Sequence, residues 1–140
     1  MTGATTDADG QSRLRTGVDV QSIEAFRELE PAVFEGIKTR SFTEAERRYC
    51  DGTAHPHQHY AGRWAAKEAF RKVVGQSVPL QSVAVERTDG PPALSLGPRA
   101  ESALSAQFGT DRWHLDVSLS HDRRADAAVA HLVGTGGSHG

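Results

Sequence analysis

Charged side chains with the spacing of a phosphate-binding surface occur in the stretch 59–75. Arg63, Lys67 and Arg71 recur every four residues, which places three cations above one another on one face of a helix. Like charges at this spacing repel and weaken an isolated helix. The stripe therefore indicates either a charged face that is simply solvated or a binding site for an anion such as a phosphate.

Acidic residues near this stretch could add a second kind of chemistry. Asp19 lies at the junction between a predicted strand and a predicted helix, where it serves either as an N-cap or as a ligand. Glu68 lies four residues before Lys72, with the acid nearer the N-terminus of the helix, which favours an ion pair. A surface salt bridge is the simplest interpretation of that pair, so these residues alone identify no reaction.

Two segments that contain histidine could suggest catalysis or metal binding. The segment 120–122 reads Ser-His-Asp, but the members of a hydrolase triad must converge in space, and adjacent residues at a strand end point in different directions. The run His55, His57 and His59 fits no standard zinc spacing, and no cysteine pair accompanies it. We therefore expect neither a hydrolase triad nor a zinc site, and His121 taken alone is an ordinary loop histidine.

The composition of the chain narrows the class of protein. Its 140 residues suit one domain with a modest core, and the net charge of -2 disfavours nucleic acid as a bulk partner. The single cysteine, Cys50, excludes an intrachain disulfide and fits a reducing, cytoplasmic setting. No apolar stretch reaches the roughly 20 residues that span a bilayer, and Met1 to Ser12 lacks the apolar region of a signal peptide. We expect a soluble, unexported protein without a membrane partner.

Strand and helix patterns are mixed without regular alternation, which indicates a single α+β domain over residues 13–133. Residues 1–12 and 134–140 lack apolar periodicity and are predicted to be disordered tails. The longest helix is predicted over His59–Val74, with Gly75 as its stop. The other expected elements are strands over Leu14–Val20, Val83–Thr88, Ala93–Leu96, Trp113–Ser120 and Ala127–Val133, and helices over Gln21–Glu30, from Thr43 to about Tyr49, and over Pro98–Phe108.

Local signals support two of these assignments. Thr43 and Glu46 have the spacing of a capping box, in which the threonine side chain accepts from a first-turn amide and the glutamate reaches back. Residues 89–92 read Asp-Gly-Pro-Pro, which is typical of a turn between the two strands of a hairpin.

Four segments taken together resemble the ordered motifs of the holo-acyl-carrier-protein synthases, which are short 4'-phosphopantetheinyl transferases. They are Gly17-Val18-Asp19-Val20, the segment 40–46, Gly62-Arg63-Trp64-Ala65-Ala66-Lys67-Glu68-Ala69-Phe70, and the segment 117–122. The resemblance implies one 4'-phosphopantetheinyl transferase-like domain, with an antiparallel sheet packed against a long central helix. It also implies transfer of the phosphopantetheine group of coenzyme A to a serine of an apo acyl carrier protein, with release of adenosine 3',5'-bisphosphate.

The same resemblance implies the catalytic and metal-binding residues. Asp19 and Glu68 would be the two protein ligands of a Mg²⁺, which prefers hard oxygen donors. Glu68 and Lys72 would be catalytic, with Lys72 near the reacting pyrophosphate. The acceptor of the serine proton is open among Glu68 acting through a metal-bound water, a water alone, and Asp122. Gln21 stands where the larger transferases carry a third acidic ligand.

Binding partners are implied as well. Arg63, Lys67 and Lys72 are similar to residues that contact coenzyme A phosphates, and His121 to a histidine that donates to the 3'-phosphate. The family assembles as trimers with sites between neighbouring subunits, so a homotrimer is expected.

The acyl carrier protein is less well defined than the reaction. Members that modify acidic carriers tend to have a basic helix after the first motif, whereas here Glu24, Glu28 and Glu30 accompany only Arg27. Like charges weaken docking, so we expect a carrier with a more neutral surface, from fatty-acid, polyketide or peptide synthesis. Two alternative functions are an inert coenzyme A-binding module and a magnesium-dependent phosphodiesterase that uses water as acceptor.

Overall fold

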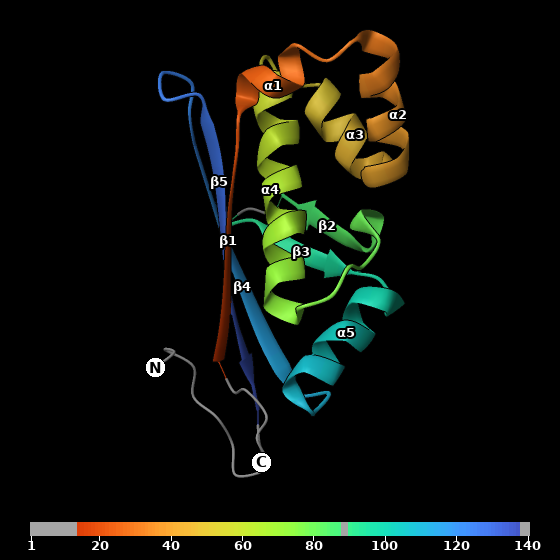
Figure 1. The fold of residues 1–140 in the computed structure, drawn as a ribbon, viewed down its shortest axis with the longest axis vertical. Helices are drawn as coiled ribbons and strands as arrows, with labels where there is room; N and C mark the ends of the chain where they lie inside the picture. The colour runs from red at the N-terminus through yellow and green to blue at the C-terminus, as the bar shows by residue number, and fades with distance from the viewer. Residues whose placement is uncertain (1–13, 88–89, 138–140) are drawn as a thin grey trace.

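A three-stranded antiparallel sheet forms one layer of the molecule, and the helices lie on one side of it (Figure 1). The computed structural model describes residues 14–87 and 90–137. Its strands β1 (Leu14–Gln21), β4 (Trp113–Asp122) and β5 (Ala127–Gly136) pair in the order β1-β5-β4. The first and fourth strands are therefore the two edges of the sheet. The predicted α+β class and the antiparallel sheet are confirmed.

Helix α4 (Pro56–Val74) crosses the inner face of the sheet against β1 and β5 (Figure 1). At Gly17, a Cβ atom would lie 2.2 Å from the carbonyl oxygen of Ala69, so the approach of strand and helix requires glycine. The predicted long central helix is confirmed. It begins before the expected His59, because proline suits the first helical position. It ends as predicted at Gly75, whose φ is 70°.

Three shorter helices pack around the N-terminal half of α4. They are α1 (Ile23–Arg27), α2 (Pro31–Ser41) and α3 (Glu44–Asp51). The predicted capping box at the start of α3 is confirmed. Thr43 Oγ1 accepts from the amide of Glu46 at 3.1 Å, and Glu46 Oε1 accepts from the amide of Thr43 at 3.0 Å.

The region around α1 and α2 differs from the sequence prediction. A single helix over 21–30 is too long, because Ser22 caps α1 by accepting from the amide of Ala25, and the residue before Pro31 is extended. Helix α2 has no counterpart among the predicted elements. Phe34 is its only large apolar side chain that is buried, so the helix has almost no apolar periodicity to reveal it.

A hairpin and a helix pack around the C-terminal half of α4. They are β2 (Val83–Glu86), which follows the 3-10 helix η1 (Leu80–Ser82), then β3 (Ala93–Leu96) and α5 (Pro98–Phe108). The pairing of β2 with β3 confirms the predicted hairpin, and α5 has the predicted bounds. The last residue of the first predicted strand, Thr88, and the first residue of the predicted turn, Asp89, lie outside the described residues.

Strand β5 continues to Gly136, so the predicted C-terminal tail over 134–140 begins too early. A Cβ atom at Gly136 would lie 3.0 Å from Cβ and Cδ1 of Phe108. Gly136, which was predicted from the sequence to belong to a disordered tail, therefore allows α5 to pack on β5. The predicted tail 1–12 and the residues 138–140 lie outside the described part of the chain.

The core divides into two hydrophobic clusters along α4. One lies between the sheet, α5 and the hairpin and includes Phe70 and Leu104. The other lies beneath α1, α2 and α3 and includes Phe42 and Tyr60. Because α4 contributes to both clusters, its surface is buried on most sides and its position is fixed. None of the described helices is long and apolar enough to cross a membrane.

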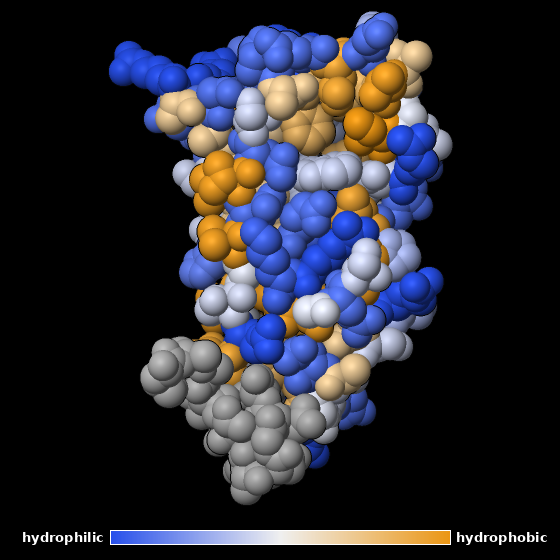
Figure 2. Space-filling model, in the orientation of Figure 1, coloured by the Kyte–Doolittle hydropathy of each residue, from blue (hydrophilic) through white to orange (hydrophobic). Residues whose placement is uncertain are grey.

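The outer face of the sheet is free of other described elements (Figure 1). Val18 and Val20 of β1 belong to this face and are 51% and 60% exposed. Figure 2 shows hydrophobic side chains at the edge of the molecule where β1 runs. Exposed apolar side chains that cluster on a strand indicate a contact surface for another molecule.

Candidate functional site

Asp19 and Lys72 meet where the β1 edge of the sheet crosses α4. The Lys72 ammonium group donates to the carbonyl oxygen of Val18 at 2.8 Å and lies 3.2 Å from Asp19 Oδ1. Asp19 Oδ2 accepts from Gln21 Nε2 at 2.8 Å. Gly17 fixes this geometry, because it holds β1 against α4 and lies on the same face of the strand as Asp19. Two residues predicted for the site are thus brought together.

Glu68 lies one helical turn before Lys72 on α4, so both side chains occupy the same side of the helix. Its carboxylate is 27% exposed and pairs with Arg71, with 3.6 Å between Oε1 and Nη1. The predicted ion pair between Glu68 and Lys72 is therefore wrong, because each has a different partner. We call Asp19, Glu68 and Lys72 the carboxylate half-site.

The carboxylate half-site offers oxygen donors of the kind that Mg²⁺ prefers. Asp19 lies inside β1, and Ser22 is the N-cap of α1, so the capping alternative for Asp19 is wrong. Within residues 14–87 and 90–137, no group of three or more His, Cys, Asp or Glu side chains is arranged to hold a metal ion. Two carboxylates fit a cation that takes its other ligands from water and substrate phosphates. The magnesium ion stays a prediction.

Lys67 is fully buried, and the protein itself satisfies its ammonium group. It donates to Glu46 Oε1 at 2.8 Å, and the carbonyl oxygens of Leu80 and Val83 accept from it at 3.0 and 2.6 Å. Burial lowers the pKa of Lys67, while the Glu46 carboxylate acts in the opposite direction. With three donors satisfied and no exposed surface, Lys67 has no access to a ligand. Its predicted contact with coenzyme A is wrong.

The other two cations of the stripe have different surroundings. Arg71 Nε and Nη2 donate to the carbonyl oxygen of Val78 at 2.9 and 2.7 Å. Arg63 is 3% exposed, and its guanidinium carbon lies 4.5 Å from the centroid of the Tyr49 ring. Acceptor groups of the protein therefore offset the charge repulsion around Lys67 and Arg71. Arg63 is the residue of the cationic stripe that is suited to an external anion.

Arg63 lines a cavity of about 130 Å³, which we call the basic pocket. Arg87 follows β2, His121 lies near the end of β4, and His59 precedes Arg63 by one turn of α4. Arg63 Nε and Gln58 Oε1 are buried without a hydrogen-bond partner among the described residues. The lining is completed by Gly62, Pro92, Leu119 and Ser120. The two arginines, together with the unsatisfied Nε–H donor of Arg63, suit an anionic ligand.

His121, the predicted donor to the 3'-phosphate, lines the basic pocket. Its Nε2 atom lies 3.4 Å from Gln58 Nε2, and its ring centroid lies 6.2 Å from that of His59. Asp122, the neighbouring candidate base, has another task. Its Oδ1 atom accepts from the amide of Arg124 at 2.9 Å and so stabilises the turn between β4 and β5.

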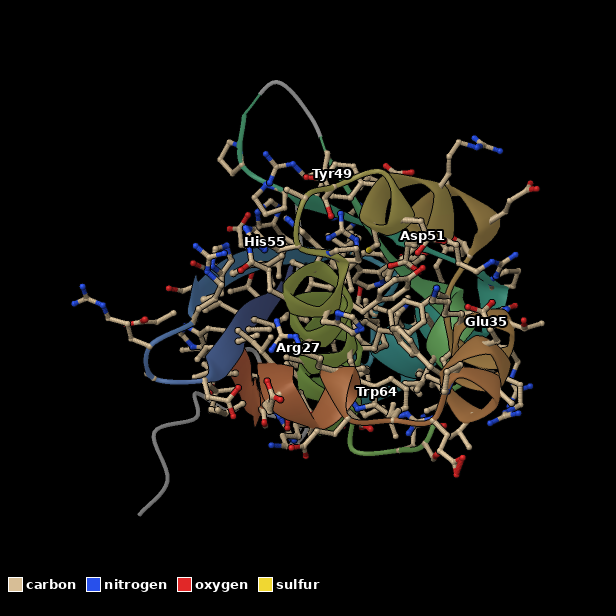
Figure 3. All side chains as sticks on the ribbon, turned by 90° about the horizontal axis from the view of Figure 1, so that it is seen from above. Arg27, Glu35, Tyr49, Asp51, His55 and Trp64 are labelled. Atoms are coloured by element: carbon tan, nitrogen blue, oxygen red, sulfur yellow. The ribbon has the colours of Figure 1, made fainter. Side chains whose placement is uncertain are left out.

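A larger cavity of about 350 Å³ also has Arg63 and Arg87 in its lining. The Tyr49 ring forms part of its wall and lies 5.9 Å from the guanidinium carbon of Arg87. Figure 3 shows Tyr49 and His55 on one side of α4 and Trp64 on the other. Because the two cavities share both arginines, they suit a ligand with an uncharged part beside a phosphate.

The three histidines around the start of α4 have separate partners. His55 Nε2 lies 2.5 Å from Arg123 Nη1. His57 stacks on Phe34 with 5.3 Å between ring centroids, whereas His59 lines the basic pocket. The three rings therefore do not converge on a common point.

The carboxylate half-site and the basic pocket lie on opposite sides of α4. Nine positions separate Arg63 from Lys72, which at about 100° per residue corresponds to two and a half turns. Within the sheet, Asp19 lies on the β1 edge and His121 on the β4 edge, with β5 between them. One chain therefore holds both parts of the predicted site but does not bring them together.

Sequence reasoning missed three residues of the basic pocket. His59 lies four residues before Arg63, so helical spacing alone places it on the cationic stripe, and Gln58 is its neighbour. Arg87 had no such signal. It lies after β2 and reaches the pocket through the packing of the hairpin against α4.

Known proteins resemble this chain over nearly all of its described length. The family model of the 4'-phosphopantetheinyl transferase superfamily matches residues 15–130. The holo-[acyl-carrier-protein] synthase of Anaeromyxobacter sp. (strain K) is 36% identical over 128 residues, which cover 88% of this chain and 98% of that relative. The Geotalea daltonii synthase is 38% identical over 124 residues, covering 84% and 94%. The solved ACPS-CoA complex of Chronobacterium ammoniagenes has a TM-score of 0.72 and 28% identity, and the match covers 89% of this chain and 98% of that one.

Proposed function

The chain belongs to the 4'-phosphopantetheinyl transferase superfamily, and we propose that it is a holo-[acyl-carrier-protein] synthase. The serine hydroxyl of an apo carrier attacks the coenzyme A phosphorus atom that bears the pantetheine. A new phosphoester bond forms as the bond to the bridging pyrophosphate oxygen breaks, and adenosine 3',5'-bisphosphate leaves. The observation that carries the proposal is the combination, within the matched residues 15–130, of a carboxylate half-site with a basic pocket.

Asp19 and Glu68 are the residues that would hold Mg²⁺, and a bound Mg²⁺ would neutralise negative charge on the pyrophosphate. Lys72 positions Asp19 through their 3.2 Å contact. Among the described residues, Val18 and Asp19 account for two of the three donors of Lys72, whose side chain is 55% exposed. The remaining donor can reach a pyrophosphate oxygen and stabilise charge on the leaving group.

The serine proton needs an acceptor as the new bond forms. Glu68, acting through a water, is the acceptor that we propose, because its partly exposed carboxylate belongs to the carboxylate half-site. Asp122 is less suited, since its carboxylate accepts from a backbone amide in the β4–β5 turn. The carboxylate half-site thus supplies both an acceptor for the serine proton, Glu68, and a cation for the leaving group, Lys72.

The basic pocket would bind the 3'-phosphate of coenzyme A. Arg63 and Arg87 supply fixed positive charge, and His121 supplies a donor at the mouth of the pocket. The larger cavity on the other side of the two arginines offers room for an uncharged part of the nucleotide. The solved relative from Chronobacterium ammoniagenes is described as a complex with CoA, which supports coenzyme A as the ligand of this chain.

We propose a homotrimer in which the carboxylate half-site of one copy faces the basic pocket of the next. The separation of the two parts across α4 supports this arrangement, because a complete site then needs two chains. The exposed side chains of Val18 and Val20 on the uncovered sheet face support it as well, since assembly would remove them from water.

The carrier that docks beside this site should have few negative charges. On α1, Glu24 pairs with Arg27 and so neutralises the basic side chain of that helix. Glu28 and Glu30 follow and are exposed. An acidic carrier surface would meet repulsion there, so we propose a more neutral carrier from fatty-acid, polyketide or peptide synthesis.

Intact-mass measurement of a panel of apo carriers tests reaction and partner together. Each carrier is incubated with this protein, coenzyme A and Mg²⁺, and we expect at least one to gain the mass of phosphopantetheine. Asp19→Ala and Glu68→Ala should abolish the gain, and omission of Mg²⁺ should do the same. Full activity of both variants would contradict the assigned carboxylate half-site.

Two outcomes of the same assay would replace the proposal. Coenzyme A binding with no modification of any carrier would favour an inert binding module. Release of adenosine 3',5'-bisphosphate in the absence of carrier would favour a phosphodiesterase, in which water takes the place of the serine.

A further inference from the structure

His59 is a titratable side chain of the basic pocket to which neither the sequence motifs nor the proposed reaction gives a role. It lies one helical turn before Arg63 on α4 and lines the same cavity as Arg87 and His121. Its ring centroid lies 5.5 Å from that of Tyr49 and 6.2 Å from that of His121. The imidazole is therefore within the pocket wall, among cations.

Two buried side chains of this pocket each have a polar atom without a hydrogen-bond partner in the described part of the chain. Gln58 is 8% exposed and Arg63 is 3% exposed, and both line the cavity. Gln58 Oε1 and Arg63 Nε have no hydrogen-bond partner among the described residues. An unsatisfied buried donor is costly, so the Arg63 Nε atom favours a ligand that brings an acceptor oxygen.

The charged and titratable groups that face His59 come from each element packed around it. They are His55 at the N-cap of α4, Arg63 of α4, Tyr49 of α3, Arg87 after β2, and His121 of β4. Burial, followed by the charge of Arg63, lowers the pKa of His59 below its usual value. These surroundings therefore favour the neutral form of the His59 imidazole before an anion binds.

A phosphate in the pocket reverses this balance. A phosphate monoester carries about two negative charges above pH 7, since its second pKa is near 6. An opposite charge within a few ångströms favours the protonated form of an imidazole. The same imidazole then donates from both ring nitrogens instead of one, which suits a ligand with several acceptor oxygens.

We propose that His59 takes up one proton from solvent when the 3'-phosphate of coenzyme A enters the basic pocket and, as an imidazolium, becomes part of the binding site for that phosphate. The identity of the ligand rests on the proposed function, whereas the proton uptake rests on the geometry of the pocket. Coenzyme A affinity then increases as the pH falls from about 8.5 to 7, by at most about tenfold per pH unit for one proton.

Isothermal titration calorimetry of the full chain with coenzyme A at pH 7.5, in two buffers with different ionisation enthalpies, measures the proton uptake directly. For the wild-type protein we expect roughly 0.5 to 1 proton per site. His59→Gln should still bind coenzyme A but take up little or no proton. His57→Gln is the matched control, because His57 stacks on Phe34 outside the pocket and should leave the uptake unchanged.

Titration with dephospho-coenzyme A, which lacks the 3'-phosphate, tests the assigned group. Uptake should vanish with this ligand while binding persists. Three results would each overturn the proposal. The first is unchanged proton uptake in His59→Gln, and the second is uptake that is lost only in His121→Gln. The third is binding of coenzyme A by the wild-type protein without proton uptake. Because calorimetry needs no carrier, proton-linked binding without carrier modification would leave this inference standing and remove only the proposed transferase activity.

Discussion

Two inactive variants should regain activity when they are mixed, if the active site forms between copies of the chain. Asp19→Ala damages the carboxylate half-site and leaves the basic pocket intact. A double variant, Arg87→Ala with His121→Ala, damages the pocket and leaves the carboxylates intact. Both altered pocket residues are exposed, so their removal should not disturb the core.

The expected recovery follows from the number of intact interfaces. Each site takes its carboxylates from one copy and its pocket from the neighbour. In trimers assembled at random from equal amounts, half of the copies supply intact carboxylates and half supply an intact pocket. About one quarter of all sites are then intact. Trimers of a single variant have no intact site, so purification of mixed trimers raises this share to about one third, and about one third of wild-type activity should return.

Carrier modification by intact mass, after co-expression of the two variants with different tags and purification of mixed assemblies, measures this recovery. Asp19→Ala mixed with Lys72→Ala is the control, because both changes fall in the carboxylate half-site and no intact interface can form. Mixed assemblies as inactive as their components would refute the inference that the site is shared between chains.

Three further predictions concern stability and assembly. Lys67→Met leaves Glu46 buried without its partner and should lower the free energy of unfolding by about 3–5 kcal/mol in urea denaturation, with coenzyme A affinity of the folded protein unchanged; a loss of affinity at unchanged stability would contradict the structural role. Gly17→Ala should prevent folding or strongly lower the thermal midpoint, because its Cβ would lie 2.2 Å from the Ala69 carbonyl oxygen; a stable, fully active variant would contradict this packing. Val20→Lys places a charge on the outer sheet face and should reduce assembly size in light scattering, with activity falling in parallel; unchanged size would contradict the use of this face.

The features that sequence predicted correctly depend on neighbouring residues. The capping box of Thr43 and Glu46 needs only residues within one turn, and the end of α4 at Gly75 needs only the left-handed conformation that glycine adopts readily. The bounds of α5 follow from a proline at its start and a glycine after its end. These local preferences do not depend on tertiary contacts, so the sequence is enough to predict them.

The role of Lys67 depends on partners that the sequence does not relate to it. Glu46 lies 21 residues earlier, and the carbonyl oxygens of Leu80 and Val83 become available only where the chain returns after α4. From the sequence alone, a lysine in a cationic stripe is therefore predicted to bind a ligand. The structure shows instead that Lys67 pairs with the buried carboxylate of Glu46. The motif that identifies the family thus combines residues of the core with residues of the site.

The placement of the two parts of the site also restricts how copies can assemble. In a two-fold dimer, the same surface of each copy meets itself. The carboxylate half-site and the basic pocket lie on opposite sides of α4 and at opposite edges of the sheet, so one such surface does not contain both. Joining the β1 edge of one copy to the β4 edge of the next is a head-to-tail contact, which either closes into a ring or continues as a filament. A closed ring in which every site is complete is the arrangement that uses both parts in every chain, and three copies form the smallest ring of this kind.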